Sequence, residues 1–455
     1  MAIKSTKRLA LALALPAVAG LAFSGCSGAG GGGGGGGGEQ AINVLMVGNP
    51  QMVDIQKLTA DNFTKDTGIK VNYTVLPENE LRDKVTQDVA TQAGQYDVAT
   101  VGAYEVPIWA KNGWLAPLDS VVNDPTFDKA DLLKPIVQSL TGEDGKLYAI
   151  PFYGESSFLM YRKDIFAKKG ITMPERPTWQ QVASMAAKVD GAEPGMKGIC
   201  LRGLPGWGEM FAPLTTVVNT FGGTWFTKDW QAQVDAPEFQ NAVNFYVNLI
   251  KAHGEPGASQ AGFTECLNAM SQGKVAMWYD ATSAAGSLED PSVSKVSGKV
   301  GYVFAPVVKT PVSGWLWTWA WVMPKTSQHT DQAAQFMRWA SGKGYEKLVG
   351  EKLGWPRVPA GKRASTYEIP QYKKASAAFG QMTLKSIEEA RPTDPGVQPR
   401  PTIGVQYVDI PEFQDLGTKV SQDIAGAIAG QGTVDQALAK GQKLAEPVAS
   451  KYQNK

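Results

Sequence analysis

The stretch "INVLMVGNPQMVDIQKLTADNFTKDTGIKVNYTV" (residues 42–75) decides the fold. It opens with a compact apolar run and closes with residues 69–75, which alternate apolar and polar side chains as a strand does. A helical segment, residues 53–66, lies between them. A second helix at 78–93 and an apolar strand at 97–101 continue the pattern. This alternation predicts an α/β fold with a parallel sheet covered by helices on both sides.

Polar side chains follow two of these strands. Asn49 comes directly after the first strand, and Tyr104 and Glu105 follow the third. Ligands of such sheets bind beyond the carboxyl ends of the strands. We therefore expect these three residues at one rim of the sheet, in the first half of a binding site.

The chain of 455 residues is too long for one ordinary hydrophobic core, so we expect two domains. A second alternating unit begins near "PFYGESSFLMYR" (residues 151–162). Further on, Thr178 and Gln181 have the spacing of a capping box, which predicts the start of a helix.

The first 40 residues have the pattern of an export signal. Lys4, Lys7 and Arg8 precede an apolar run at residues 9–23 that is too short to span a bilayer comfortably. The run ends in "FSGCSG", which resembles the lipobox of bacterial lipoproteins. We expect a signal peptide at 1–25, a lipidated Cys26, a glycine-rich tether over 26–40, and a mature protein held to the outer face of the cell membrane by its lipid.

Composition argues against several functions. The 44 basic and 43 acidic residues leave no charge excess to attract nucleic acid. The two histidines, His253 and His329, lie in polar contexts at helix ends, and no hydrolase, metalloprotease or phosphate-loop motif occurs. We expect no catalytic residues, no metal and no cofactor. Cys200 and Cys266 are compatible equally with a disulfide and with two free thiols.

Several separated motifs resemble those of the solute-binding proteins of bacterial ABC sugar importers, a family similar to maltodextrin-binding protein. They are "YDVATVGAYEVPIWAKNGWLAPLD" (96–119), "GKLYAIPFYGESSFLMYRKDIF" (145–166), "GKVAMWYDAT" (273–282) and "TVDQALAKGQ" (433–442). The stretches at 151–157, 198–209, 313–321 and 404–414 look most like the branch that binds mannitol, sorbitol and related polyols. The resemblance covers residues 40–450.

The resemblance implies two α/β lobes joined by a hinge that the chain crosses several times. The expected lobes are residues 41–150 with 306–352, and residues 151–305 with 353–455. The lobes would close on a sugar alcohol or small sugar, and a membrane permease would recognise the closed form. We expect a monomer that works with the permease subunits of an importer.

The segment "SGWLWTWAWVM" (residues 313–323) carries tryptophans at 315, 317, 319 and 321. It is too short for a membrane anchor. In a strand the four indoles point to one side, and they span about 20 Å at roughly 3.3 Å per residue, which is longer than a six-carbon ligand. We therefore expect Trp315 and Trp317 to contact ligand, and Trp319 and Trp321 to pack in the core.

The resemblance and the positions along the chain give the remaining site candidates: Glu155, Arg202, Trp207, Asp280, Trp355 and Gln406. Each also has a structural alternative. Glu155 and Arg202 could pair with each other, Asp280 could cap the next helix, Trp207 could fill a loop, and Tyr104 could pack on the hinge. An alternative function is a secreted carbohydrate hydrolase, which needs only two acidic residues, for example two of Glu105, Glu155 and Asp280.

Overall fold

The computed structural model describes residues 40–453. The expected signal peptide, lipidated Cys26 and most of the glycine-rich tether lie outside the described residues. Within the described range, no helix has the length and apolar character needed to cross a bilayer.

The strands form two sheets. They are β1 (Ala41–Val47), β2 (Lys70–Leu76), β3 (Val98–Val101), β4 (Ile150–Glu155), β5 (Ser157–Arg162), β6 (Met277–Ala281), β7 (Val300–Phe304) and β8 (Trp317–Val322).

The helices of the first half are α1 (Pro50–Thr59), α2 (Lys65–Thr67), α3 (Glu78–Thr91), α4 (Glu105–Lys111), α5 (Asp119–Val122), α6 (Lys134–Ser139), α7 (Lys163–Lys168), α8 (Trp179–Val189) and α9 (Phe211–Phe221). Those of the second half are α10 (Pro237–His253), α11 (Phe263–Ser271), α12 (Ala284–Leu288), α13 (Thr330–Ser341), α14 (Lys343–Lys352), α15 (Pro370–Ala375), α16 (Gly380–Glu389), α17 (Phe413–Ile428) and α18 (Val434–Gln453).

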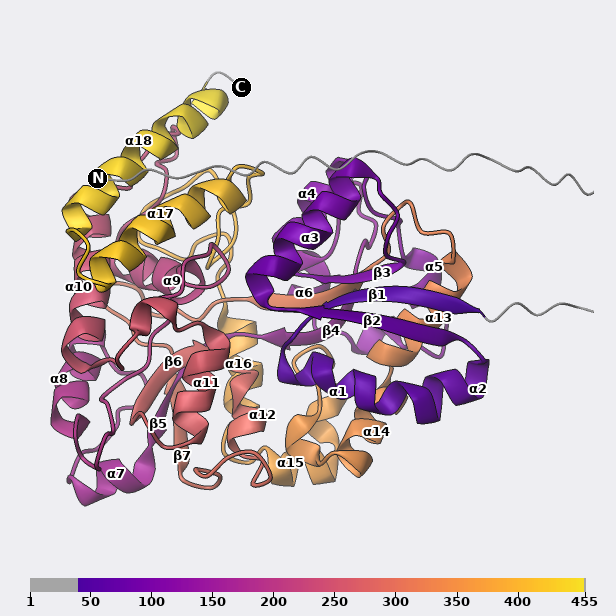
Figure 1. Cartoon of the computed structure of the whole chain (residues 1–455), viewed down its shortest axis with the longest axis horizontal. Coiled ribbons are helices and arrows are strands. Elements are labelled where there is room, and N and C mark those ends of the chain that lie inside the picture. The colour runs from indigo at the N-terminus through magenta and orange to yellow at the C-terminus, as the bar shows by residue number, and fades with distance from the viewer. Residues whose placement is uncertain (1–39, 454–455) are drawn as a thin grey trace, which may run out of the picture. The chain divides into compact units, whose positions relative to one another are not determined.

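The first lobe is built on a five-stranded sheet of order β2-β1-β3-β8-β4. β1 pairs in parallel with β2 and β3, as the alternating sequence predicts. β8 pairs antiparallel with both β3 and β4, so the sheet is mixed rather than purely parallel. The chain returns to this sheet from the second lobe, which lets β8 enter in the opposite direction. α3 and α4 lie on one side of the sheet, and α1 and α2 lie on the other (Figure 1).

The second lobe is built on an antiparallel sheet of order β6-β5-β7. α11 packs on β6, and α16 packs on β5 and β7. The C-terminal helices α17 and α18 pack together and on α10 (Figure 1). The capping box at Thr178 and Gln181 starts α8 as predicted, because the Thr178 hydroxyl accepts a hydrogen bond from the Gln181 amide.

The chain passes between the sheets in a few short segments. β4 continues in the first sheet to Glu155, and β5 starts the second sheet at Ser157. This crossing follows residue 155, because β4 stays hydrogen-bonded to β8 up to the Glu155–Trp317 pair. The chain crosses back between the end of β7 and the start of β8.

Candidate ligand-binding site

A cavity is lined by residues of both lobes. The lining consists of Asn49, Glu78, Arg82, Glu155, Arg202, Trp207, Gly208, Ala212, Phe263, Ala281, Ser283, Trp315, Trp317, Trp319 and Gln406. Seven of these are sequence candidates: Asn49, Glu155, Arg202, Trp207, Trp315, Trp317 and Gln406.

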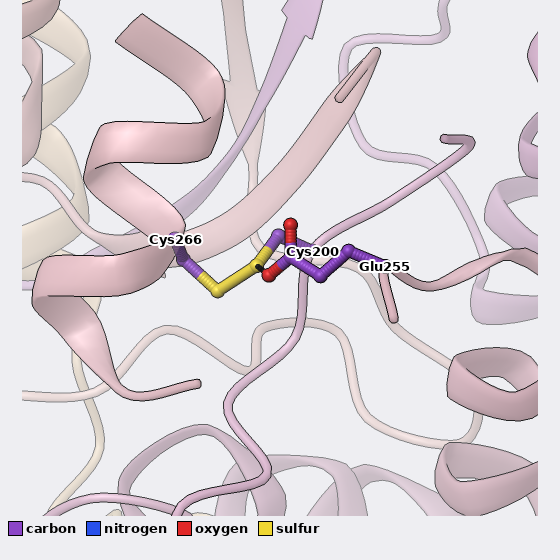
Figure 2. A group of neighbouring side chains, drawn as sticks. All are labelled: Cys200, Glu255 and Cys266. Atoms are coloured by element: carbon purple, nitrogen blue, oxygen red, sulfur yellow. Dashed lines mark hydrogen bonds between the residues drawn. A yellow bond between two sulfur atoms is a disulfide. The ribbon is translucent and has the colours of Figure 1, made fainter. Parts of the chain in front are cut away.

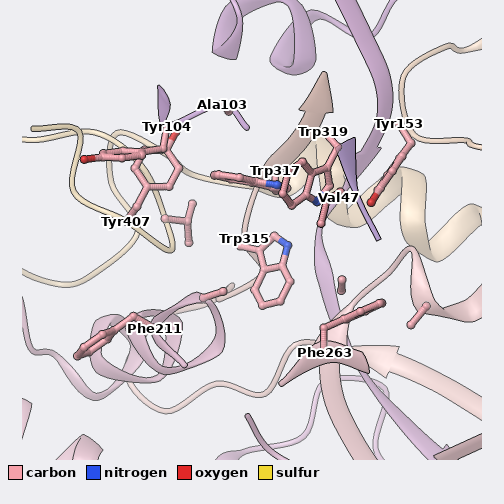
Figure 3. Packing of buried hydrophobic residues seen from close by; sticks show 14 of the residues in the cluster. Val47, Ala103, Tyr104, Tyr153, Phe211, Phe263, Trp315, Trp317, Trp319 and Tyr407 are labelled. Carbon is pink, nitrogen blue, oxygen red and sulfur yellow. The ribbon is translucent and has the colours of Figure 1, made fainter. Parts of the chain in front are cut away.

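Three indoles from the tryptophan-rich segment form one wall of this cavity. Trp317 and Trp319 lie on β8, where side chains at every second position share one face, and Trp315 lies just before the strand. Figure 3 shows Trp315, Trp317 and Trp319 close together, with Phe263 of the second lobe nearby. The wall offers flat apolar surface, which suits the C–H groups of a carbohydrate-like ligand.

We expected two of the four tryptophans to line the cavity and two to pack in the core, and the structure differs at one of them. Trp321 is fully buried and packs on Phe152 and Phe336, with ring centroids 5.0 and 5.5 Å away, as predicted for a core residue. Trp319 lines the cavity, so its assignment to the core alone is wrong. Arg82 of α3, which also lines the cavity, lies about as close to Trp319 (5.1 Å) as to Trp317 (5.2 Å).

The position of Trp317 depends on a glycine after β3. A Cβ atom at position 102 would lie 1.7 Å from the Trp317 ring, so any side chain other than hydrogen would displace the indole. Gly102 thus shapes the cavity wall without contacting the cavity itself.

Trp207 brings the second lobe against the first. Its ring centroid lies 4.1 Å from the guanidinium carbon of Arg82 and 6.0 Å from the Trp317 ring. Tyr104 packs behind it at 4.4 Å, and the Tyr104 hydroxyl donates to the Ile410 carbonyl at 2.8 Å. Tyr104 does not line the cavity and instead supports Trp207 from behind. This is a packing role, as in the structural alternative considered for Tyr104 from the sequence.

Arg82 is buried between two carboxylates. Its Nη2 donates to Glu78 at 2.8 Å, and its Nη1 donates to Glu105. Glu105 also accepts from the Gly102 amide at 3.0 Å. Burial raises the pKa of Glu105, and the charge of Arg82 offsets part of that rise. Glu105 does not line the cavity and instead holds Arg82 in place.

Arg202 has a similar arrangement in the second lobe. Its Nε and Nη2 donate to Asp280 at 2.8 and 2.6 Å, and its Nη1 donates to Glu209 at 3.2 Å. Asp280 is fully buried and also accepts from the Trp278 indole, so it lies behind Arg202 and outside the cavity lining. The alternative pairing of Arg202 with Glu155 is wrong, because Asp280 and Glu209 take the guanidinium.

Glu155 and Asn49 provide polar groups at the end of β4 and the start of α1. Glu155 accepts a hydrogen bond from the Ser283 hydroxyl. Burial raises the pKa of Glu155 to about 8, and the Ser283 hydrogen bond and the Arg202 charge offset part of the rise. The Asn49 amide donates to the Tyr153 hydroxyl at 2.9 Å.

Three buried polar atoms of lining residues have no hydrogen-bond partner within the described part of the chain. They are the indole nitrogens of Trp207 and Trp315 and the Oε1 atom of Gln406. Leaving such atoms unsatisfied costs about 1–3 kcal/mol each. Two donors and one acceptor beside one cavity match a ligand whose hydroxyl groups both donate and accept.

Trp355 lies apart from the cavity. It is partly buried and packs against Gly350 of α14, where a Cβ atom would lie 2.5 Å from its ring. With Tyr104, Glu105 and Asp280, it is one of four sequence candidates that the structure places outside the lining.

Sequence reasoning missed Glu78 and Arg82, although a signal was present. β2 ends at Leu76, so the residues that follow it reach the same rim as Asn49 and Glu105. Glu78 and Arg82 are also spaced i and i+4, so they share one face of α3. The other missed lining residues, apart from Trp319, have no comparable signal: Gly208, Ala212, Phe263, Ala281 and Ser283.

A disulfide joins Cys200 to Cys266 in the second lobe (Figure 2). Arg202 and Phe263, two and three residues away from these cysteines, both line the cavity. Glu255 lies beside the bond, with its Oε1 2.7 Å from the Cys200 sulfur. Burial raises the pKa of Glu255 to about 7. Since a disulfide sulfur is not a thiolate, the oxidised pair is not a metal-binding site.

Comparison with known proteins gives the class of the molecule. Residues 49–347 match the family of the bacterial extracellular solute-binding protein. The mannitol-binding protein of Pseudomonas aeruginosa is 41% identical over 405 residues, which are 89% of this chain and 92% of that protein. An ABC transporter solute-binding protein of Agrobacterium vitis, solved with bound D-mannitol, is 49% identical with a TM-score of 0.88, over 90% of this chain and 99% of that one.

The maltose-bound MalE3 of T. maritima is 20% identical and has a TM-score of 0.76, over 90% of this chain and 99% of that one, which shows the same two-lobed fold. The chain belongs to the bacterial extracellular solute-binding protein family. The family is extracytoplasmic, and the relatives named above are binding proteins rather than enzymes.

Proposed function

We propose that this chain is the solute-binding protein of an ABC importer, and that it captures a sugar alcohol such as mannitol and delivers it to a membrane permease. The observation that carries the proposal is the cavity between the lobes, where three indoles face buried carboxylates, arginines and unsatisfied hydrogen-bonding atoms. The two relatives that bind mannitol, at 41% and 49% identity, support the choice of ligand.

The lining suits an open-chain polyol for two physical reasons. Indole faces contact C–H groups and keep water from the neighbouring hydrogen bonds. The hydroxyl groups of the ligand would meet Asn49, Glu155 and Gln406, together with the indole N–H groups of Trp207 and Trp315. Hydrogen bonds to charged groups are stronger than those between neutral groups, so Glu78, Arg82 and Arg202 add affinity. In this arrangement Asp280 and Glu105 act indirectly, by positioning the arginines.

Ligand binding would stabilise the contacts that already join the lobes. The Asn79 amide donates to the Pro205 carbonyl at 2.9 Å, and the Gln51 amide donates to the Ser283 carbonyl at 3.1 Å. These contacts link α1 and α3 of the first lobe to loops of the second lobe. A ligand that touches both lobes shifts the equilibrium toward this closed form by its additional contacts there. The permease would then recognise the closed form.

We propose lobe boundaries near residues 155, 305–316 and 350–356, and a monomeric mature protein anchored through a lipid on Cys26. The anchor is tested by a Cys26→Ala variant expressed in a bacterial host. The variant is expected in the soluble fraction after leader cleavage, and a variant that stays with the membrane would contradict the anchor.

Isothermal titration calorimetry over alditols, monosaccharides and disaccharides tests the ligand class. We expect a hexitol to bind at one site per chain and to be recovered unaltered. Recovery of a chemically changed ligand would favour the hydrolase alternative. Binding of disaccharides alone would overturn the choice of a polyol.

A further inference from the structure

Acidic side chains outnumber basic side chains around the cavity. The two cations of the lining are Arg82 and Arg202, and both are almost completely buried. Arg82 is held by Glu78 and Glu105, and Arg202 is held by Asp280 and Glu209. Each guanidinium charge therefore already faces two acidic side chains.

Glu155 adds a fifth acidic side chain that has no cation of its own. Its hydrogen-bond partner is the neutral hydroxyl of Ser283. Glu155 and Glu78 both line the cavity, so a ligand meets them directly. Burial raises the pKa of Glu155 and of Glu209 to about 8, and neighbouring carboxylates, Glu78 among them, add to both rises. The pocket is thus a place where another negative charge is unfavourable.

This arrangement has a consequence for the ligand. A phosphate or carboxylate that enters the pocket loses its water, which is unfavourable unless a free cation or several N–H donors replace it. Both guanidinium charges are already compensated, whereas their remaining N–H groups can still donate to neutral hydroxyl groups. A positively charged ligand would instead meet Glu155, Glu78 and the faces of three indoles, all of which attract cations.

We infer that the cavity selects its polyol by charge: it admits neutral polyols and their amino derivatives, and it excludes phosphate esters and carboxylates of the same carbon chain. The inference rests on the proposed polyol-binding function and adds a second substrate class to it, the cationic amino-polyols. No residue of the lining offers the uncompensated positive charge that a sugar phosphate would require.

The test is calorimetry with four ligands of one carbon chain: D-mannitol, D-mannitol 1-phosphate, D-mannonate and 1-amino-1-deoxy-D-mannitol. We expect the phosphate and the carboxylate to bind at least ~100-fold more weakly than mannitol, because each is desolvated beside acidic side chains. We expect the amine to bind within about tenfold of mannitol, because the carboxylates and indoles compensate its loss of water. At pH 7 the bound ammonium should ionise Glu155, so titrations in buffers of different ionisation enthalpy should show proton release for the amine and none for mannitol.

Variants of the lining separate charge from shape. The double variant Glu78→Gln, Glu155→Gln keeps the size of both side chains and removes both ionisable carboxyl groups. It should reduce the discrimination against the phosphate and abolish proton release by the amine. The matched control is Glu143→Gln, an exposed glutamate outside the cavity, which should leave all four affinities unchanged.

The outcomes distinguish this inference from the function on which it rests. Phosphate or carboxylate binding as tight as mannitol would overturn the exclusion of anions. An amine that binds ~100-fold more weakly than mannitol would overturn the admission of cations. If no neutral polyol binds, the proposed function itself fails, and this inference fails with it.

Discussion

The guanidinium of Arg82 lies 4.1 Å from the ring of Trp207, although 125 residues separate them and they belong to different lobes. Arg82 is on α3 of the first lobe, and Trp207 is in a loop of the second. The contact lies beside the cavity, so one pair of side chains joins the closing of the lobes to the shape of the binding site.

We expect Trp207→Ala to weaken polyol binding by about 2 kcal/mol, because the ligand loses an indole face and the lobes lose a contact that favours closure. Calorimetry measures the change. Trp114→Ala, which removes an indole that does not line the cavity, is the control. Equal affinities in wild type and Trp207→Ala would remove this residue from the site.

Trp315 and Trp321 lie on one segment and have different roles. Trp315→Ala should weaken binding by about 2 kcal/mol, because a cavity wall and an indole donor are lost. Trp321→Phe should lower the melting temperature with little effect on affinity, since Trp321 packs only in the core. Calorimetry and thermal denaturation separate the two effects. A reversed pattern would contradict the placement of the cavity along β8.

Asp280 is expected to act through Arg202. Asp280→Asn breaks a buried ion pair, and such changes typically cost about 3–5 kcal/mol of the free energy of unfolding. Urea denaturation measures that loss, and calorimetry should show weaker polyol binding as well. Adding Arg202→Met should restore part of the stability, because Glu209, the other partner of Arg202, has a pKa raised to about 8 by burial and can stay protonated once the arginine is gone, while affinity should stay low. Recovery of affinity in the double variant would show that Arg202 does not contact ligand.

Glu155 should make the stability of the ligand-free protein depend on pH. A glutamate in an unfolded chain titrates near pH ~4.3, whereas burial raises the pKa of Glu155 to about 8 in the folded protein. Between these values the folded state binds more protons, so the free energy of unfolding falls as pH rises from about 4 to about 8. Glu209, with its pKa also raised to about 8, adds a fall in the same window.

Glu155→Gln isolates the contribution of Glu155. The variant should be as stable as wild type near pH 4.5 and more stable by roughly 4 kcal/mol at pH 8, because the unfolded wild type gains stability by ionising Glu155 over this range and the folded wild type does not. Denaturation at both pH values provides the measurement, with Glu143→Gln as control. A stability difference that does not change with pH would contradict the raised pKa.

The disulfide should stabilise both the fold and the site. Its cysteines are 66 residues apart, and removing a native disulfide typically costs about 2–5 kcal/mol. A Cys200→Ser, Cys266→Ser protein should therefore unfold at lower denaturant concentration. It should also bind polyol more weakly, because Arg202 and Phe263 lose their common anchor. Unchanged affinity in the folded variant would limit the disulfide to a role in stability.

Sequence reasoning succeeded where the signal lay in neighbouring residues. The strand–helix alternation of residues 42–101 predicted the parallel part of the first sheet, and the alternate tryptophans predicted one shared face. The rule that ligands lie beyond strand ends led to Asn49, and the resemblance to a known family led to Glu155, Arg202, Trp207 and Gln406; all five line the cavity. Sequence reasoning did not predict which residues pair with the charged side chains. Arg202 and its partner Asp280, for example, lie 78 residues apart, so no local pattern connects them.

The sequence by itself thus determined the α/β class, the two lobes, the family and most of the aromatic wall, since these follow from local periodicity and from motifs that can be read along the chain. Only the tertiary structure decided that Trp319 joins the cavity while Trp321 does not, that Asp280 and Glu105 lie behind arginines, and that Glu78 and Arg82 complete the lining. Those outcomes depend on how helices and sheets pack against one another, and contacts between residues distant in sequence leave no periodic pattern in the chain.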